Sequence, residues 1–518
     1  MGLFDRLAGL AARAQNWNFS VLGSVYIGPG HFLRLPPLAF LGVLAGGIAW
    51  VALVSICAWW VFNPRYLKAA KGGDGEMARV LFSSFAFVYL LFGAYTTFSY
   101  PPTTDEPHYL VLADSLLSGG GVEVSGEYAR KDFMKFYPSA TIDPHTVVTR
   151  EGRMYSQHTV GLPALLLPGY WLAGRWGTTA TMALLSALLV ALLFRISRKL
   201  GNGTVESART AVLTGATAPL LFASGTVFTE VPAAVLSSMS LLGLGRGWIA
   251  PVCGSLLPWL HPRYALISAG LALLDIFSSR ERGKSVARWI ASGIPSGAGF
   301  LSVYHGDSLT SILNVLTEKY PSRIEDLTAG SLAAVSFANP LKGALAKLFD
   351  RDFGWIPYAP WAGALIIGVA ASLKAGKYPH RIFLVGAGGY FFLTCLFRNW
   401  GGSAFPGRTL IPLLPFITGY TAAGMGWVGK KGPRARVMAA LIALSLLVSW
   451  ALTAIPVLRY GSGRDWMAVK FGAAWRTFPA SWFPSFISNE TRSVAVSGAI
   501  VLVLAGLVLV SRSRGRKR

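Results

Sequence analysis

The sequence has few charged residues. Asp, Glu, Lys and Arg make up 14% of its 518 residues, against about 25% in ordinary soluble proteins, whereas hydrophobic residues reach 53%. Acids are the scarcer sign, with 23 Asp and Glu against 47 Lys and Arg and a formal net charge of +24. This composition excludes a disordered chain and an ordinary cytosolic enzyme, and long apolar runs indicate one large membrane-embedded body.

Cysteine is also scarce, and common catalytic motifs are missing. Cys57, Cys253 and Cys395 each lie in an apolar stretch without CxxC spacing, so we expect buried, inert thiols and no disulfide or zinc framework. The sequence has no phosphate-binding loop, no HExxH pattern and no nucleophile elbow. The basic tail 512–518 is best explained by anionic lipid, so we expect membrane lipids and no nucleic acid as partners.

Apolar runs predict an all-α polytopic membrane protein with about 12–13 transmembrane helices, since a span needs about 20 apolar residues. The pair 248–260 and 264–278 is either two crossings or a re-entrant hairpin. The candidate spans are 36–62, 80–98, 178–194, 209–226, 230–245, 248–260, 264–278, 285–303, 355–373, 381–397, 409–427, 437–456 and 495–511.

The N-terminal region divides into two parts. Residues 1–35 lack the compact apolar core and cleavage site of a signal peptide, and their beginning predicts an amphipathic leader on a membrane surface. Residues 36–79 form an extra membrane segment and a cytoplasmic loop. The run 36–62 either crosses once or re-enters near Gly46 and Gly47, so the side of the N-terminus stays open.

Basic residues at the span ends set the orientation. With 63–79 in the cytoplasm, most of the excess positive charge falls on cytoplasmic edges and most acids fall outside. We expect a body over 80–456 with a large first outer loop, 99–177, whose last part is a juxtamembrane helix, and a second outer loop, 304–354. Residues 457–518 provide an aromatic-rich outer loop, a last span and the basic tail.

Scarce acids at outer turns are the first candidates for chemistry. Asp105 and Glu106 follow a span directly, and Glu230 is the charge of the next short outer turn. A carboxylate at such a place can act as a general base toward a hydroxyl or as a ligand for a divalent cation. The alternative interpretation is helix capping by acids at helix N-termini.

Basic and histidine residues mark two further outer turns. His261 is a candidate metal ligand, and Arg263, Arg398 and Arg408 are candidate phosphate-binding residues. Interfacial anchoring of the first turn and snorkelling arginines in the second are the alternatives. Because the helix interiors are nearly free of charge, the pattern favours chemistry at the outer surface over a conduction path.

The order of these motifs resembles the GT-C superfamily of polytopic membrane glycosyltransferases, such as protein mannosyltransferases and aminoarabinose transferases. The resemblance covers most of residues 80–430. It rests on Thr104–Tyr109 (TDEPHY), on Tyr155–His158 with Gly161, Pro163 and Pro168, on Phe228–Pro232 (FTEVP), and on Trp400–Arg408 followed by Pro412 and Pro415.

The resemblance implies a GT-C-like fold and an inverting glycosyltransferase that uses a polyprenyl-phosphate sugar donor. Asp105 would be the base toward the acceptor, a glycan, lipid or protein, with Glu106 and Glu230 as further catalytic acids. Further substrate-binding candidates, besides the arginines, are His108, Tyr109 and His158. Where a metal is used, Mg²⁺ or Mn²⁺ would be held by Asp105, Glu230 and His261. The expected location is a prokaryotic cytoplasmic membrane, with the site facing outward onto cell-envelope glycan. The alternative function is transport or flipping of a lipid-linked sugar.

Overall fold

The structure is a computed structural model, which describes residues 73–137, 139, 141–148, 152–303, 340–375, 380–396, 405–454, 459, 483–486 and 490–510. The outer part of the first loop contains α5 (Glu106–Ser118), α6 (Ser125–Ala129), η1 (Asp132–Lys135), β1 (Thr146–Val148) and β2 (Met154–Ser156). The remaining elements are α4 (Gly73–Ser99), α7 (Gly161–Lys199), α8 (Thr204–Ala216), α9 (Leu220–Ala223), α10 (Glu230–Gly243), α11 (Ile249–Ser255), α12 (Leu257–Leu260), η2 (Pro262–Tyr264), α13 (Ala265–Ser278), α14 (Arg282–Val303), α17 (Pro340–Phe349), η4 (Pro360–Gly363), α18 (Ala364–Ala375), α19 (Arg381–Gly386), α20 (Gly388–Leu396), η5 (Arg408–Leu413), α21 (Leu414–Val428), α22 (Pro433–Ala454) and α24 (Glu490–Val510).

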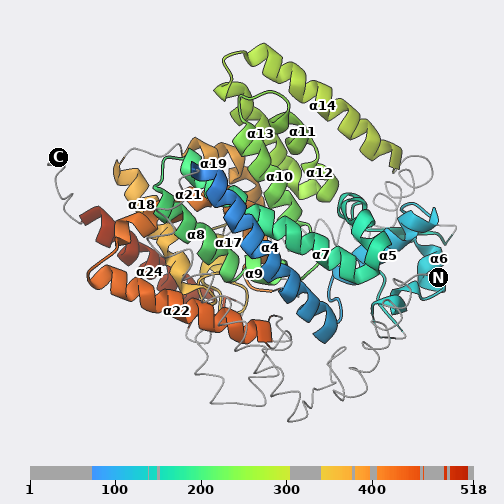
Figure 1. The fold of residues 1–518 in the computed structure, drawn as a ribbon, viewed down its shortest axis with the longest axis horizontal. Helices are drawn as coiled ribbons and strands as arrows, with labels where there is room; N and C mark the ends of the chain where they lie inside the picture. The colour runs from blue at the N-terminus through green and yellow to red at the C-terminus, as the bar shows by residue number, and fades with distance from the viewer. Residues whose placement is uncertain are drawn as a thin grey trace, which may run out of the picture.

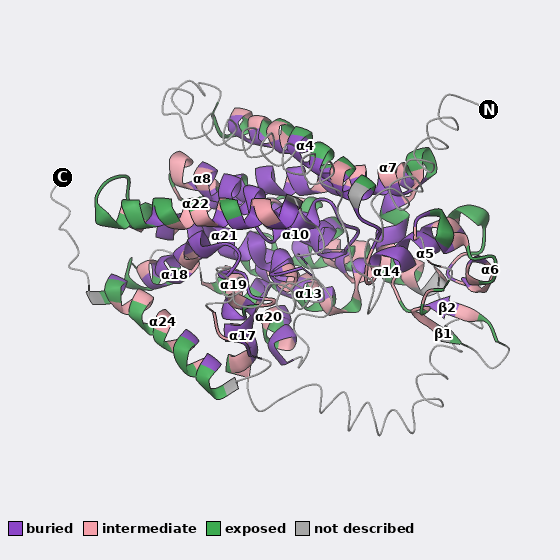
Figure 2. Ribbon diagram, turned by 90° about the horizontal axis from the view of Figure 1, so that it is seen from below, coloured by how far each residue is buried: buried purple, intermediate pink, exposed green. Residues whose placement is uncertain are grey.

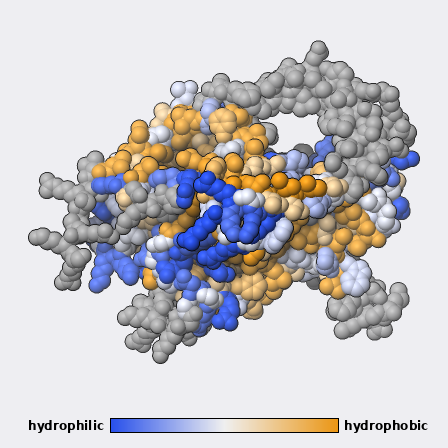
Figure 3. All heavy atoms as spheres, turned by 90° about the horizontal axis from the view of Figure 1, so that it is seen from above, coloured by the Kyte–Doolittle hydropathy of each residue, from blue (hydrophilic) through white to orange (hydrophobic). Residues whose placement is uncertain are grey.

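The all-α membrane architecture expected from the sequence is confirmed. Within the described residues, four helices are long and apolar enough to cross a membrane: α4, α7, α22 and α24. Three shorter apolar stretches, Glu230–Gly243, Ile249–Leu260 and Pro360–Ala375, accompany them. Figure 3 shows broad apolar areas on one face of the molecule, interrupted by a hydrophilic patch.

Helix α7 is two helices joined at a sharp bend. Ala173 and Gly174 have non-helical backbone angles, and Gly174 has φ 53°, which glycine adopts without a steric penalty. Gly169 and Gly177 would lie about 12 Å apart along a straight helix, yet a Cβ on Gly177 would clash with the carbonyl oxygen of Gly169. The bend separates the juxtamembrane helix, predicted as the last part of the loop 99–177, from the long span that follows.

The core of the body forms where α7, α10 and α21 meet. Helix α4 packs along α7, and α10 and α21 contact α7 as well (Figure 1). Figure 2 shows α10 and α21 largely buried, whereas α24 lies at an edge with many exposed side chains. Helices α18 and α21 cross closely, because Gly368 and Gly424 bring the backbones into contact.

The stretch 209–226, predicted as one span, is broken between α8 and α9. The break contains the cis bond Ala218–Pro219. Its freed backbone groups are satisfied by distant residues, because Trp355 Nε1 donates to the carbonyl oxygen of Ala218 at 2.8 Å and Ser449 Oγ accepts from the amide of Ala218 at 3.1 Å. Such partners are needed wherever backbone leaves a helix within a membrane body.

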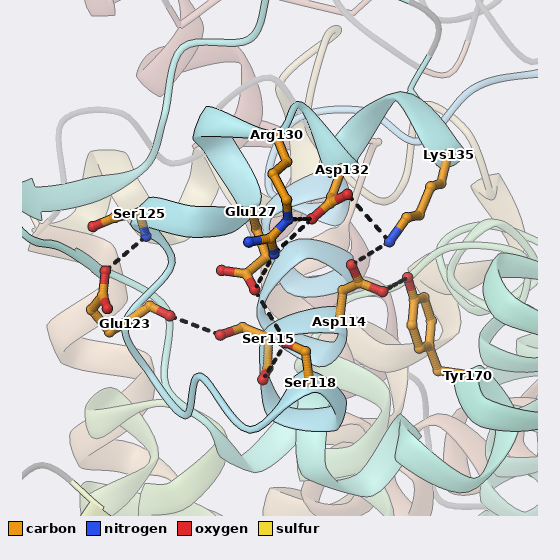
Figure 4. A network of polar contacts seen from close by, with 10 residues as sticks. All are labelled: Asp114, Ser115, Ser118, Glu123, Ser125, Glu127, Arg130, Asp132, Lys135 and Tyr170. Carbon is orange, nitrogen blue, oxygen red and sulfur yellow. Dashed lines mark hydrogen bonds and ion pairs between the residues drawn. The ribbon is translucent and has the colours of Figure 1, made fainter.

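The first outer loop forms a small unit with its own apolar cluster, which includes Leu110, Val124 and Phe133. An ion-pair network joins α5 to η1 beside this cluster (Figure 4). The ammonium group of Lys135 lies 2.7 Å from Asp114 Oδ2 and 3.4 Å from Asp132 Oδ1. The network fixes the end of α5 that lies away from Asp105.

Several predicted features fall outside the described residues. These are the leader 1–35, the membrane segment 36–62, Cys57, most of the second outer loop, Arg398 with its glycine-rich turn, most of 457–489 and the basic tail.

Candidate functional site

Arg408 links the two outer acids that the sequence singles out. Its Nη2 donates to Asp105 Oδ2 at 3.1 Å, and its Nε donates to Glu230 Oε1 at 2.9 Å. The guanidinium also lies over the ring of Phe228, with 3.9 Å from Cζ to the ring centroid. Asp105 and Glu230 lie 303 and 178 positions before Arg408 in the sequence. They therefore meet at one planar cation, which can pair with two carboxylates at once.

The backbone before Asp105 is strained. Thr104 has φ 54°, a conformation that β-branched residues rarely adopt, and its buried Oγ1 has no hydrogen-bond partner among the described residues. Asp105 itself lies at the N-cap of α5, but its side chain does not cap the helix. Its carboxylate instead points to Arg408, so the capping interpretation of Asp105 is wrong.

Glu106 is turned inward and fully engaged. Its Oε1 accepts from the amide and hydroxyl of Thr103, and its Oε2 accepts from the amide of Val227 at 2.8 Å. Burial raises the pKa of Glu106, and these donors oppose the shift. Glu106 therefore ties the start of α5 to the turn that carries Glu230, which is a positioning arrangement.

Glu230 is the first residue of α10, and its side chain is 1% exposed. Its Oε1 also accepts from Arg263 Nη2 at 2.7 Å, and its Oε2 has no hydrogen-bond partner among the described residues. His261 precedes η2 and accepts the amide of Arg263 on its Nδ1 at 3.2 Å. His261 thus caps the turn that presents Arg263.

Three histidines surround Asp105 on its other side. His145 and His158 flank β1 and β2, whose antiparallel pairing of Thr146 with Ser156 brings the two imidazoles together. His145 Nδ1 lies 3.3 Å from His158 Nε2 and 3.7 Å from Asp105 Oδ1. His108 stacks on His145, with 3.9 Å between ring centroids.

Two aromatic residues complete this group. Tyr128 Oη lies 2.7 Å from Nδ1 of His108, which it holds in place from α6. The ring of Tyr109 packs on His158, with 4.6 Å between centroids, and burial raises the pKa of Tyr109. Both phenols therefore stay protonated at neutral pH.

The charge states of the site follow from burial and the arginine. Burial alone would raise the pKa of Asp105, but Arg408 and the neighbouring histidines outweigh it, so this pKa lies below its ordinary value. Burial lowers the pKa of His158 to about 4 and that of His108 to about 3. At neutral pH the site therefore holds an ionised Asp105 beside the uncharged imidazoles of His108 and His158.

Most of the residues predicted for the site converge. Asp105, Glu230, Arg263 and Arg408 form one ion-pair network, and His108, Tyr109 and His158 adjoin Asp105. All of them come from segments that the charge pattern places outside, which is the arrangement that one shared site requires. Sequence reasoning missed His145 and Tyr128; Asp143-Pro144-His145 in the polar loop was the available signal for the former.

The donor set that fits a metal ion differs from the predicted one. Among the described residues, Asp105, His145 and His158 offer ligand atoms that all lie within 4.8 Å of one another. Of the predicted set, only Asp105 belongs to this group. Two imidazoles and one carboxylate suit Mn²⁺, Fe²⁺ or Zn²⁺ better than Mg²⁺.

Comparisons with known proteins give little further guidance. No family model matches the chain, and no curated protein matches it. Two solved structures share a distant likeness: the archaeal oligosaccharyltransferase AglB from Archaeoglobus fulgidus in complex with an inhibitory peptide and a dolichol-phosphate (13% identity, TM-score 0.36), and the oligosaccharyltransferase of Archaeoglobus fulgidus in the apo form (12% identity, TM-score 0.37). Each match covers 79% of this chain and 60% of the other, so the chain spans about three fifths of the length of the proteins that it resembles.

Proposed function

We propose that the protein is a GT-C-type membrane glycosyltransferase. It transfers a sugar from a polyprenyl-phosphate donor to a hydroxyl of a glycan, lipid or protein acceptor at the extracytoplasmic face. The observation that carries this proposal is the joining of Asp105 and Glu230 by Arg408, beside the uncharged imidazoles of His108 and His158. Asp105 can accept the proton of the acceptor hydroxyl, and the arginines beside it can stabilise the negative charge that develops on the leaving phosphate.

Asp105 is the acid that a substrate can reach. Its side chain is 28% exposed, whereas that of Glu230 is 1% exposed. Arg408 holds Oδ2 of Asp105, which leaves Oδ1 for a hydroxyl. Glu230 in turn fixes Arg263 and Arg408, so its part in the proposal is to orient the two arginines.

The proposed reaction is a single displacement. The acceptor hydroxyl donates a hydrogen bond to Asp105 and attacks the anomeric carbon of the donor sugar. A carbon–oxygen bond forms to the acceptor while the bond between the anomeric carbon and the phosphate oxygen breaks, which inverts the anomeric centre. The proton passes to Asp105, and the electron pair leaves with the lipid phosphate.

The leaving phosphate needs positive charge more than it needs a proton, because it is a stable anion. Arg408 and Arg263 supply that charge from fixed positions. Nε of Arg263 has no hydrogen-bond partner among the described residues, so one N–H of the network is free to donate to a phosphate oxygen. Preorganised donors of this kind lower the barrier without reorganisation during reaction.

A divalent cation fits the proposal at Asp105, His145 and His158. The low pKa of His158 keeps its imidazole unprotonated at neutral pH, as ligation requires. A bound ion would supply positive charge beside the acceptor hydroxyl, and Asp105 would then orient that hydroxyl.

The proposed location follows from the charge pattern. The site residues lie in segments assigned to the outer side, so we place the site at the outer face of a prokaryotic cytoplasmic membrane, acting on cell-envelope glycan. The donor and the acceptor would meet there, beside the juxtamembrane part of α7.

The test is sugar transfer by the purified full chain, offered a panel of polyprenyl-phosphate sugars with and without chelator. Asp105→Asn is expected to reduce transfer about 100-fold or more, since it removes the proton acceptor. Asp114→Asn is the matched control, because Asp114 lies on the same helix in the Lys135 network. Near wild-type transfer by a folded Asp105→Asn variant would contradict the role of Asp105.

A further inference from the structure

Lys347 is a buried lysine that the reaction above does not use. It lies in α17, and the residue is 2% exposed. Its ammonium group donates to Thr409 Oγ1 at 3.1 Å. Among the described residues, no carboxylate lies within 4.0 Å of its Nζ.

Thr409 joins Lys347 to the site. Thr409 follows Arg408 directly in η5, and its carbonyl oxygen accepts from Tyr390 Oη at 3.3 Å. The positive charge of Arg263 also reaches Lys347, where it disfavours protonation. Lys347 on α17 therefore contacts the residue next to Arg408, and α17 packs on α20, which carries Tyr390.

Positive groups outnumber negative ones at this place. Arg263, Arg408 and Lys347 are cations, and Asp105 and Glu230 are the acids with which the two arginines pair. A buried ammonium with one neutral acceptor is costly, and it gains greatly from an anion. Burial lowers the pKa of Lys347 to about 8, so most of the ammonium is still protonated at pH 7.

We propose that Lys347 binds the phosphate group of the lipid donor and of the polyprenyl-phosphate product, together with the free Nε–H of Arg263. The inference rests on the function proposed above and adds a binding residue to it. A phosphate offers several acceptor oxygens, which match the two N–H donors of Lys347 and the one of Arg263 that have no partner among the described residues. A polyprenyl phosphate is favoured over a soluble anion, because it is the product that the proposed reaction releases beside Arg263.

The test is binding of a short-chain polyprenyl phosphate to the full chain in detergent, measured by calorimetry at pH 7. This product needs no chemistry, so binding is independent of turnover. Lys347→Met is expected to weaken binding about 10- to 100-fold. Lys342→Met on the same helix is the matched control and should bind as the wild type does.

The dependence of binding on pH separates a direct contact from a structural effect. Wild-type affinity should fall as the pH rises from 7 to 9.5, since Lys347 loses its proton in this range. Lys347→Arg should bind at pH 7 and lose little affinity at pH 9.5, because arginine stays charged.

The other charged and titratable groups near Lys347 are the same in the wild type and in Lys347→Arg. They are Cys395 and Tyr390 on α20, Arg263 on η2 and Arg408 on η5, with Arg492 on the neighbouring α24. If the pH dependence of the affinity came from one of these groups, it would persist in Lys347→Arg. Equal slopes in the two proteins would therefore overturn the proposal.

The remaining outcomes are also decisive. Unchanged affinity of a folded Lys347→Met variant would overturn the proposal and leave the proposed function standing. A folded wild type that binds no polyprenyl phosphate would overturn both. Inorganic phosphate that binds as tightly as the lipid, with the same loss in Lys347→Met, would overturn the assignment to a lipid. If Lys347→Met does not fold, the comparison of Lys347→Arg with the wild type across pH decides.

Discussion

Without ligand, replacing Lys347 by methionine should stabilise the folded protein at neutral pH. The pKa of Lys347 falls from an ordinary 10.5 to about 8 on folding, which corresponds to a penalty of about 3 kcal/mol. Methionine fills a similar volume without a charge, but it leaves the hydroxyl of Thr409 without its donor, at a cost of about 1 kcal/mol. The expected net gain in the free energy of unfolding is about 2 kcal/mol.

The same pKa sets how the gain depends on pH. Below about pH 8 both folded and unfolded chains hold the lysine proton, so the penalty is constant. Between pH 8 and pH 10.5 the unfolded chain binds more protons than the folded chain, and wild-type stability therefore rises with pH. The advantage of Lys347→Met should shrink across this window.

Denaturant unfolding in detergent at pH 7 and pH 10 measures this difference, with Lys342→Met as the control. The reasoning would be refuted if Lys347→Met were less stable than the wild type at pH 7. Saturating polyprenyl phosphate should offset most or all of this gain at pH 7, because a 10- to 100-fold difference in affinity stabilises the wild type by about 1.4–2.7 kcal/mol relative to Lys347→Met.

Three further predictions concern the site and its frame. Arg408→Lys should reduce sugar transfer and destabilise the protein by about 3–5 kcal/mol, because one ammonium cannot hold both acids and Glu230 stays buried. Denaturant unfolding and sugar transfer, measured on the same variant, check this. Unchanged values would be evidence against Arg408 joining the two acids. Gly424→Ala should cost about 3 kcal/mol or more, since its Cβ would clash with the carbonyl oxygen of Ala364. Gly426→Ala on the same helix is the control, because its Cβ has only an ordinary contact, and equal melting temperatures would refute the close crossing. His145→Ala should weaken Mn²⁺ or Zn²⁺ binding about 10-fold or more at pH 7, measured by calorimetry after chelation, and an unchanged affinity would exclude the imidazole as a ligand.

Charge placement predicted the partners of the site but not their contacts. Asp105 and Glu230 were selected because acids are scarce and these two fall on outer turns, and Arg408 because it lies in a glycine-rich outer turn. The charge pattern places all three turns on one side of the membrane, so a shared site could be predicted. That a single arginine joins both acids depends on the broken segment before Glu230 and on Gly407. Gly407 has φ 74°, and a Cβ there would meet Pro219 at 3.1 Å. Short sequence motifs do not predict a contact between residues so far apart in the sequence.

The histidine cluster shows the same limit. His145 and His158 become neighbours through strands of three residues each, which are too short for alternation to predict. Lys347 lies in a segment that reads as a polar outer loop, and its burial results from packing of α17 on α20. The bend of α7 is easier to predict from the sequence. Residues 160–194 are longer than one span, and Gly174 lies where the helix changes direction.

The central claim is that the protein moves a sugar between covalent partners. Proteoliposomes that contain the full chain, a polyprenyl-phosphate donor with a labelled sugar and an acceptor test it directly, with Asp105→Asn in parallel. The account predicts that wild-type protein releases label from the lipid and links it to the acceptor, whereas Asp105→Asn leaves the label on the lipid. Label that stays on the lipid and only changes leaflet in the wild type would contradict the account and indicate a flippase.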